Sequence, residues 1–86
     1  MTARTEELTT ARAEALFTSD LSSDGSVTRT EITGIIRQAL RVYGGIPGCA
    51  AEMAKRYGES PETSARRMQW AREVVERSFP ARPASR

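Results

Sequence analysis

Apolar residues recur along the chain at the spacing of α-helices, and the clearest run covers residues 32–43. Its apolar positions follow one another at steps of three, one, three, one and three residues: Ile32, Ile35, Ile36, Ala39, Leu40 and Tyr43. This spacing places them on one face of a helix. Thr28 and Glu31 have the spacing of a capping box, and Val27 is placed as the first half of a hydrophobic staple. The pattern predicts a helix that begins after Thr28 and that the two glycines at 44–45 end.

A first helix and a loop are expected before this run. Thr5 precedes two glutamates, and this order suits a helix start because acidic side chains are favourable at the positive end of a helix. The helix is expected to end near Thr18. Its apolar stripe is thin: Leu8, Ala11, Ala15 and Leu16. The following segment, residues 19–26, is dense in serine, aspartate and glycine, which favour turns.

Two more helices are expected after Ile46-Pro47-Gly48. Gly58 is placed to end the third helix in a left-handed turn. Ser60 is placed to cap the fourth, with Pro61 in the first turn, where its missing N–H costs nothing. The fourth helix is expected over about Pro61 to Ser78. The third helix has one apolar face: Cys49 or Ala50, Met53, Ala54 and Tyr57.

These elements define the fold class. No alternation of apolar and polar residues typical of strands competes with the helices. We therefore expect an all-α fold, a compact four-helix domain with a C-terminal hairpin that resembles a helix-turn-helix. A chain of 86 residues supports one core. The domain is expected to cover residues 5–79, between disordered ends at 1–4 and 80–86.

The only tryptophan lies beside the apolar stripe of the last helix. At 100° per residue, Trp70 is about 100° from the centre of that stripe. We expect the first helix to close over it. The alternative is that Trp70 anchors a protein partner or a second subunit, a role in which tryptophan is favoured. The stripe itself consists of four residues: Met68, Ala71, Val75 and Phe79.

The charge of the chain is compatible with nucleic acid but does not demand it. The net charge is +2 and the pI is about 9.2. The positive excess lies in residues 44–86, which hold eight Lys or Arg against five acids. This half contains the predicted hairpin.

The segment 50–72 has the features of a helix-turn-helix. Ala54, Tyr57, Gly58 and Met68 suit the packing and the turn. The run AEMAKRYGESPETSARRM resembles the helix-turn-helix in region 4 of bacterial sigma factors, and this resemblance implies DNA binding. Glu59 and Ser64 depart from that pattern, since the family usually has apolar residues there. The expected contacts with bases and phosphates comprise five residues: Lys55, Arg56, Thr63, Arg66 and Arg67.

An ordinary helical hairpin explains the same segment. Four oppositely charged pairs have i,i+4 spacing, so much of the basic face is expected to be neutralised internally. These pairs leave Lys55 and Arg67 as the free cations, and Arg66 is a third if its own pair does not form. The pairs are Glu52–Arg56, Glu62–Arg66, Arg72–Glu76 and Glu73–Arg77.

Residues 20–31 match the pattern of an EF-hand calcium loop. Asp20, Ser22 and Asp24 occupy positions 1, 3 and 5, Gly25 occupies position 6 and Glu31 occupies position 12. The capping box and an Asp-Gly turn explain most of this match. We therefore favour no metal site, and calcium remains an alternative.

The residue inventory argues against catalysis. The chain has no histidine and one cysteine, Cys49, which we expect in the core. No glycine-rich phosphate loop, metal cluster or cofactor motif is present. No leader or membrane-length apolar run is present either, so we expect a cytoplasmic protein without a membrane partner. The runs ALFTSDL and YGGIPGCAAEMAKRYGESPETSARRMQWAREVV resemble short proteins of streptomycetes and other actinobacteria, and this resemblance implies a bacterial origin and no particular activity.

The sequence therefore leads to three hypotheses. The first is a small DNA-binding or transcription-associated protein. The second is a protein-interaction module, small subunit or homodimer that uses Trp70 and nearby arginines. The third is a single calcium loop.

Overall fold

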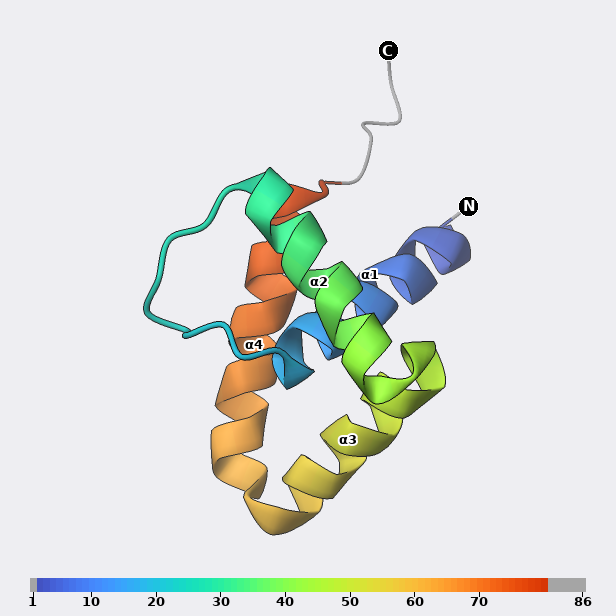
Figure 1. Cartoon of the computed structure of the whole chain (residues 1–86), viewed down its shortest axis with the longest axis vertical. Helices are drawn as coiled ribbons and strands as arrows, with labels where there is room; N and C mark the ends of the chain where they lie inside the picture. The colour runs from blue at the N-terminus through green and yellow to red at the C-terminus, as the bar shows by residue number, and fades with distance from the viewer. Residues whose placement is uncertain (1, 81–86) are drawn as a thin grey trace.

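The computed structural model describes residues 2–80, with side chains from residue 6 onward, and these residues form four helices (Figure 1). The helices are α1 (Thr2–Thr18), α2 (Arg29–Tyr43), α3 (Gly45–Glu59) and α4 (Pro61–Ser78). Residues 2–80 contain no strand, so the all-α, four-helix prediction is confirmed. α1 begins at Thr2, three residues before the expected start, because no glycine or proline interrupts residues 2–18. The expected disordered segment 1–4 thus overlaps a helix, while Met1 and residues 81–86 lie outside the described residues.

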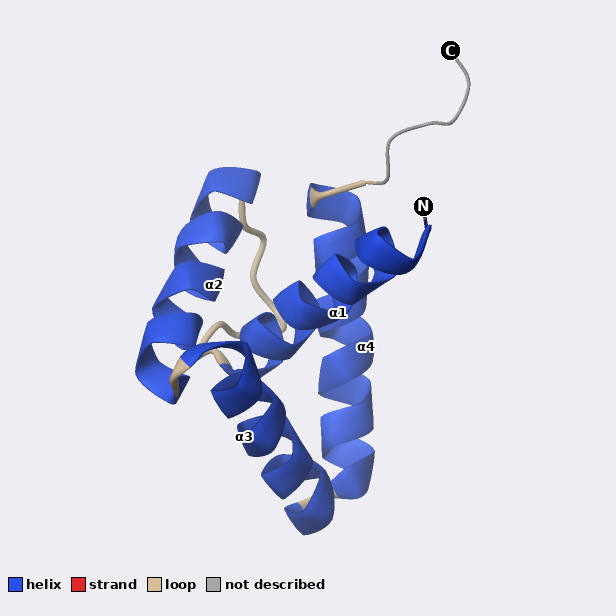
Figure 2. Ribbon diagram, turned by 90° about the vertical axis from the view of Figure 1, so that its right-hand side faces the viewer, coloured by secondary structure: helices blue, strands red, loops and turns tan. Residues whose placement is uncertain are grey.

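α1 is the central helix of the domain. Figure 2 shows it crossing between α2 and α4, and it packs against each of the other three helices. Its C-terminal end is buried on all sides, since Ala15, Leu16, Phe17 and Thr18 are each at most 1% exposed. The apolar stripe that the sequence predicted for α1 was too narrow at this end of the helix. Leu8, which belongs to the predicted stripe near the N-terminal end of α1, is 48% exposed. A helix buried around its circumference needs partners on every side, which the other three helices supply.

α2 begins and ends as its local sequence requires. The amide of Glu31 donates to Thr28 Oγ1 at 3.1 Å and the amide of Thr28 donates to Glu31 Oε1 at 2.8 Å, which confirms the capping box. Gly44 ends the helix in the left-handed region with φ 85°, and its amide donates to the Leu40 carbonyl. The face that the spacing predicted packs against the core, with Ile32 completely buried.

α3 begins earlier than expected and ends for a different reason. It starts at Gly45, and Gly48 lies in its first turns so close to α2 that a Cβ there would overlap the Tyr43 carbonyl. Gly58 does not end the helix in a left-handed turn, because the only glycines with positive φ among residues 2–80 are Gly44 and Gly45. α3 continues to Glu59. The break falls at Ser60, whose non-helical backbone is favoured by the following proline.

The apolar face of α3 was also partly misassigned. Cys49 is completely buried and Met53 and Tyr57 are half-buried against the core, but Ala54 is exposed. α3 therefore contacts the core mainly through Cys49, Met53 and Tyr57. Ala54, which the helix-turn-helix pattern places at the crossing of two helices, faces solvent here.

α4 has the predicted bounds and a simpler start than predicted. Pro61 occupies the first turn as expected, but Ser60 makes no side-chain capping bond. Ala71, Val74 and Val75 are buried. Ser64 is also buried, at 5% exposed, although the sigma-factor helix-turn-helix that this segment resembles usually has an apolar residue there. Met68, Trp70 and Phe79 are half-buried against the same core.

Candidate functional site

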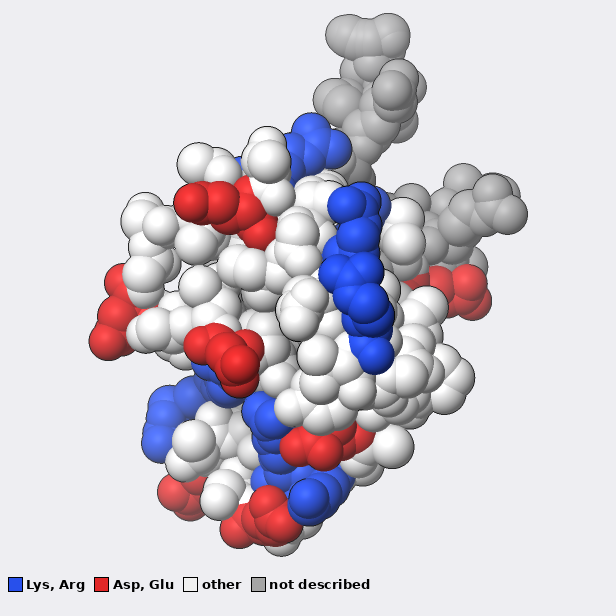
Figure 3. Space-filling model, in the orientation of Figure 1, with Lys and Arg blue, Asp and Glu red and all other residues white. Residues whose placement is uncertain are grey.

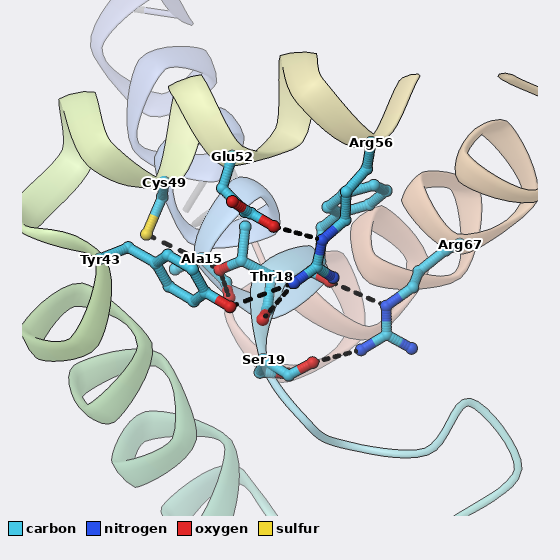
Figure 4. A network of polar contacts seen from close by, with 9 residues as sticks. Ala15, Thr18, Ser19, Tyr43, Cys49, Glu52, Arg56 and Arg67 are labelled. Atoms are coloured by element: carbon cyan, nitrogen blue, oxygen red, sulfur yellow. Dashed lines mark hydrogen bonds and ion pairs between the residues drawn. The ribbon is translucent and has the colours of Figure 1, made fainter. Parts of the chain in front are cut away.

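Arg67, which the sequence presented as a free cation for DNA, is half-buried and held by hydrogen bonds to its own chain. From α4 its guanidinium reaches the end of α1 and the loop that follows (Figure 4). Nε donates to the Phe17 carbonyl at 2.8 Å, Nη2 donates to the Ser19 and Leu21 carbonyls at 2.9 Å each, and Nη1 donates to Ser23 Oγ at 3.2 Å. The prediction that Arg67 is free is therefore wrong.

Arg56 from α3 approaches the same place. Its Nε pairs with Glu52 at 2.8 Å, and its Nη2 donates to the Tyr43 hydroxyl at 3.1 Å and to the Thr18 carbonyl at 3.5 Å. Its guanidinium lies 5.9 Å from the centre of the Phe17 ring. As Figure 4 shows, Arg56 thus connects α1, α2 and α3.

Both arginines serve the C-terminal end of α1. The last carbonyls of a helix lack partners within the helix, and α1 has no basic residue of its own in its last turn. Arg56 and Arg67 supply donors and positive charge there. Burial lowers the pKa of the Arg67 guanidinium, the nearby charge of Arg56 lowers it further, and Asp20 opposes the shift. Arginine nonetheless stays a cation.

Trp70 takes part in the same arrangement. The guanidinium of Arg67 lies over the indole ring, 4.6 Å from its centre. The ring is half-buried and packs against the core, while the expected closure of α1 over it stays a prediction. One face of Trp70 is therefore occupied by a cation of the same chain.

Three of the five predicted DNA contacts remain at the surface. Lys55, Thr63 and Arg66 are exposed around the α3–α4 turn. Within residues 6–80 the only salt bridge is Glu52–Arg56, so the expected Glu62–Arg66 pair does not form. Ion pairs between exposed side chains contribute little free energy, which explains why this pair need not form.

The cleft beside these residues carries no excess of positive charge. It lies between α3 and α4 and encloses about 300 Å³. Two arginines and two glutamates line it, namely Arg56, Arg67, Glu52 and Glu59. Their charges balance, so the cleft lacks the positive field with which proteins bind phosphates.

Comparison with protein-family models, curated proteins and solved structures finds no match.

A groove lies between α2 and the segment that joins it to α1. It encloses about 570 Å³ and is open to solvent. The two charged residues that line it are Asp20 and Glu31, and no lysine or arginine of the described chain does so. Most of its remaining wall is apolar: Leu21, Val27, Ile35, Ala39, Val42 and Tyr43.

Figure 3 shows, in the orientation of Figure 1, the face of the molecule on which α2 and the loop before it lie. The middle of the upper part of this face is largely uncharged, with acidic side chains on its left and a run of basic side chains on its right, and the lower part carries both signs intermixed. Val42 is 63% exposed on α2, whereas Leu21, Val27 and Ile35 are half-buried. Arg67 fixes one wall of the groove, because the carbonyls of Ser19 and Leu21 are among its acceptors.

Sequence reasoning missed the groove. A helical glycine, Gly34, and an apolar residue outside the core spacing, Val42, were the available signals on α2. The other wall comes from a loop, and no periodicity reveals where a loop lies.

The calcium alternative receives no support from the loop geometry. One carboxylate oxygen of Glu31 already accepts the Thr28 amide, and Ser22 Oγ accepts the amide of Asp24 at 3.2 Å. Among residues 6–80 no three acidic, cysteine or histidine side chains are grouped as a metal site requires. Asp20, Asp24 and Glu31 thus do not converge.

Cys49 belongs to the core, as expected. It is completely buried, with its Sγ 3.7 Å from Thr18 Oγ1 and 3.8 Å from the Ala39 carbonyl.

None of the helices in residues 2–80 is sufficiently long and apolar to cross a membrane.

Proposed function

We propose that this chain is a protein-interaction module whose groove beside α2 binds an apolar helical segment that carries a basic residue. The observation that carries the proposal is the groove itself, an open, mainly apolar cavity of about 570 Å³. Cavities of this size and lining are typical of binding sites, and an amphipathic helix lying in an apolar groove is a recurring mode of recognition.

Charge favours a basic flank on the bound segment. The chain has a net charge of +2, yet the charged residues that line the groove are both acidic, Asp20 and Glu31. An acidic rim around an apolar floor selects a segment with apolar residues on one face and Lys or Arg beside them. Val42 supports this, because an apolar side chain left 63% exposed at the rim loses its contact with water when a partner covers it.

The test is selection of peptides of about 15 residues, roughly four helical turns, from a displayed library against the full chain. We expect the selected peptides to have apolar residues at i, i+3 or i+4 and i+7, with Lys or Arg beside them. Val42→Glu should abolish binding, and Leu8→Glu should leave it unchanged, because Leu8 is 48% exposed and lies outside the groove. Equal binding to both variants would refute the proposal.

We keep nucleic-acid binding as a second proposal, now restricted to Lys55, Thr63 and Arg66. Their exposure around the α3–α4 turn favours it. Lys55→Ala combined with Arg66→Ala should weaken binding to duplex DNA and reduce its dependence on salt. DNA affinity equal to that of the wild type would exclude this surface.

A further inference from the structure

We infer that the segment bound in the groove is α2 of a second copy of this chain, lying antiparallel to the first α2. The inference rests on the proposed function, since it names the partner for the same groove. In such a homodimer the two copies are related by a two-fold axis, so each contributes the same surface. α2 must therefore fit a copy of itself.

Gly34 is the first reason to place a helix there. It lies in the interior of α2, where glycine is less favourable than alanine. The single chain gives no steric reason for it, because a Cβ at Gly34 would meet nothing within 4 Å and its φ is not positive. Gly34 lines the groove. A small residue at this position allows the backbone of a second helix to approach closely.

The charges of α2 are the second reason. Glu31 lies in the first turn of the helix and Arg41 lies in the last, and both are exposed. An antiparallel copy brings Glu31 of each chain beside Arg41 of the other, which gives two ion pairs. Glu31 Oε2 makes no hydrogen bond within residues 6–80, and Arg41 has only an exposed contact of 3.2 Å with Gln38. Both side chains can therefore form the new pair.

The apolar residues fit the same arrangement. The antiparallel copy carries Val42 of each chain towards the end of the groove formed by Val27 and the first turns of the other α2. Val42 of each copy then fills an apolar cavity and loses its exposure to water. One symmetric arrangement thus covers the glycine, pairs the charges and buries the exposed valine.

The experiment measures the mass of the full chain by sedimentation equilibrium from about 1 μM to 1 mM, the range of weak to moderate association. We expect a monomer–dimer equilibrium. Val42→Glu should make the chain monomeric throughout, and Gly34→Ala should raise the dissociation constant about tenfold or more, because the added methyl group separates the two helices. Circular dichroism should show both variants folded.

Gly58→Ala is the matched control. Gly58 is also an exposed helical glycine with open space around it, but it lies on α3, outside the groove. Its substitution should leave the dissociation constant unchanged. A chain that stays monomeric at all concentrations, or a dimer that Gly34→Ala and Val42→Glu do not weaken, overturns the inference. Peptide binding that Val42→Glu abolishes would in that case still support the proposed function with a different partner.

Discussion

Arg67→Met tests whether the long-range hydrogen bonds of Arg67, and not only the packing of the helices, stabilise this fold. The change keeps much of the apolar stem and removes four hydrogen bonds to the end of α1 and the following loop. A hydrogen bond from a charged donor contributes about 1.5–3 kcal/mol, but Arg67 is only half-buried and water replaces part of the loss. We therefore expect the free energy of unfolding to fall by roughly 2–4 kcal/mol.

This loss is large for so small a domain. Stabilities of about 0.05–0.15 kcal/mol per residue are usual, so the change removes a substantial fraction of the total. The midpoint of thermal unfolding should fall by at least about 10 °C. Urea unfolding followed by circular dichroism gives the free energy. Fluorescence of Trp70, the only tryptophan, reports the loss of the guanidinium 4.6 Å from its ring.

Two further variants test whether the stability lost in Arg67→Met comes from the hydrogen bonds of its guanidinium. Arg66→Met removes a neighbouring exposed arginine and should change stability by no more than about 0.5 kcal/mol. Arg67→Lys keeps the charge but loses the planar fork of donors, so it should recover little of the lost stability. If Arg67→Met and Arg66→Met unfold at the same urea concentration, the assignment of Arg67 to the end of α1 is wrong.

Three other predictions concern the ends of α2 and the loop before it. Gly48→Ala places a methyl group against the backbone of α2, and it should lower the free energy of unfolding by about 3 kcal/mol or prevent folding, as measured by circular dichroism. Thr28→Ala removes the capping box and should cost about 1 kcal/mol in urea unfolding, whereas Thr28→Ser should cost little. Calcium at about 1 mM, the weak end of EF-hand affinities, should leave the amide signals of Gly25 and Val27 unchanged, and saturable shifts there would restore the calcium hypothesis.

Local sequence determined the helices and several of their ends. Thr28 and Glu31 form their capping box within four residues of chain, and Pro61 both starts α4 and breaks the helix at Ser60. Such signals are reliable because every atom involved is close in sequence. Gly58 misled because a glycine permits a left-handed turn without requiring one, while the residue before a proline is actively driven out of the helix.

Only the tertiary structure decided what the arginines and the loop do. The acceptors of Arg67 lie 44 to 50 residues away along the chain, so nothing near Arg67 distinguishes it from the exposed Arg66. The groove likewise exists because a loop without periodicity lies beside α2, where it leaves open both residues of the predicted stripe, such as Ile35, and residues outside it, such as Val42. The sequence by itself determined four helices and the core face of α2, since short-range spacing and capping control those. Tertiary packing decided which charges are internal and which surface is open to a partner, because both depend on segments that meet only in the folded chain.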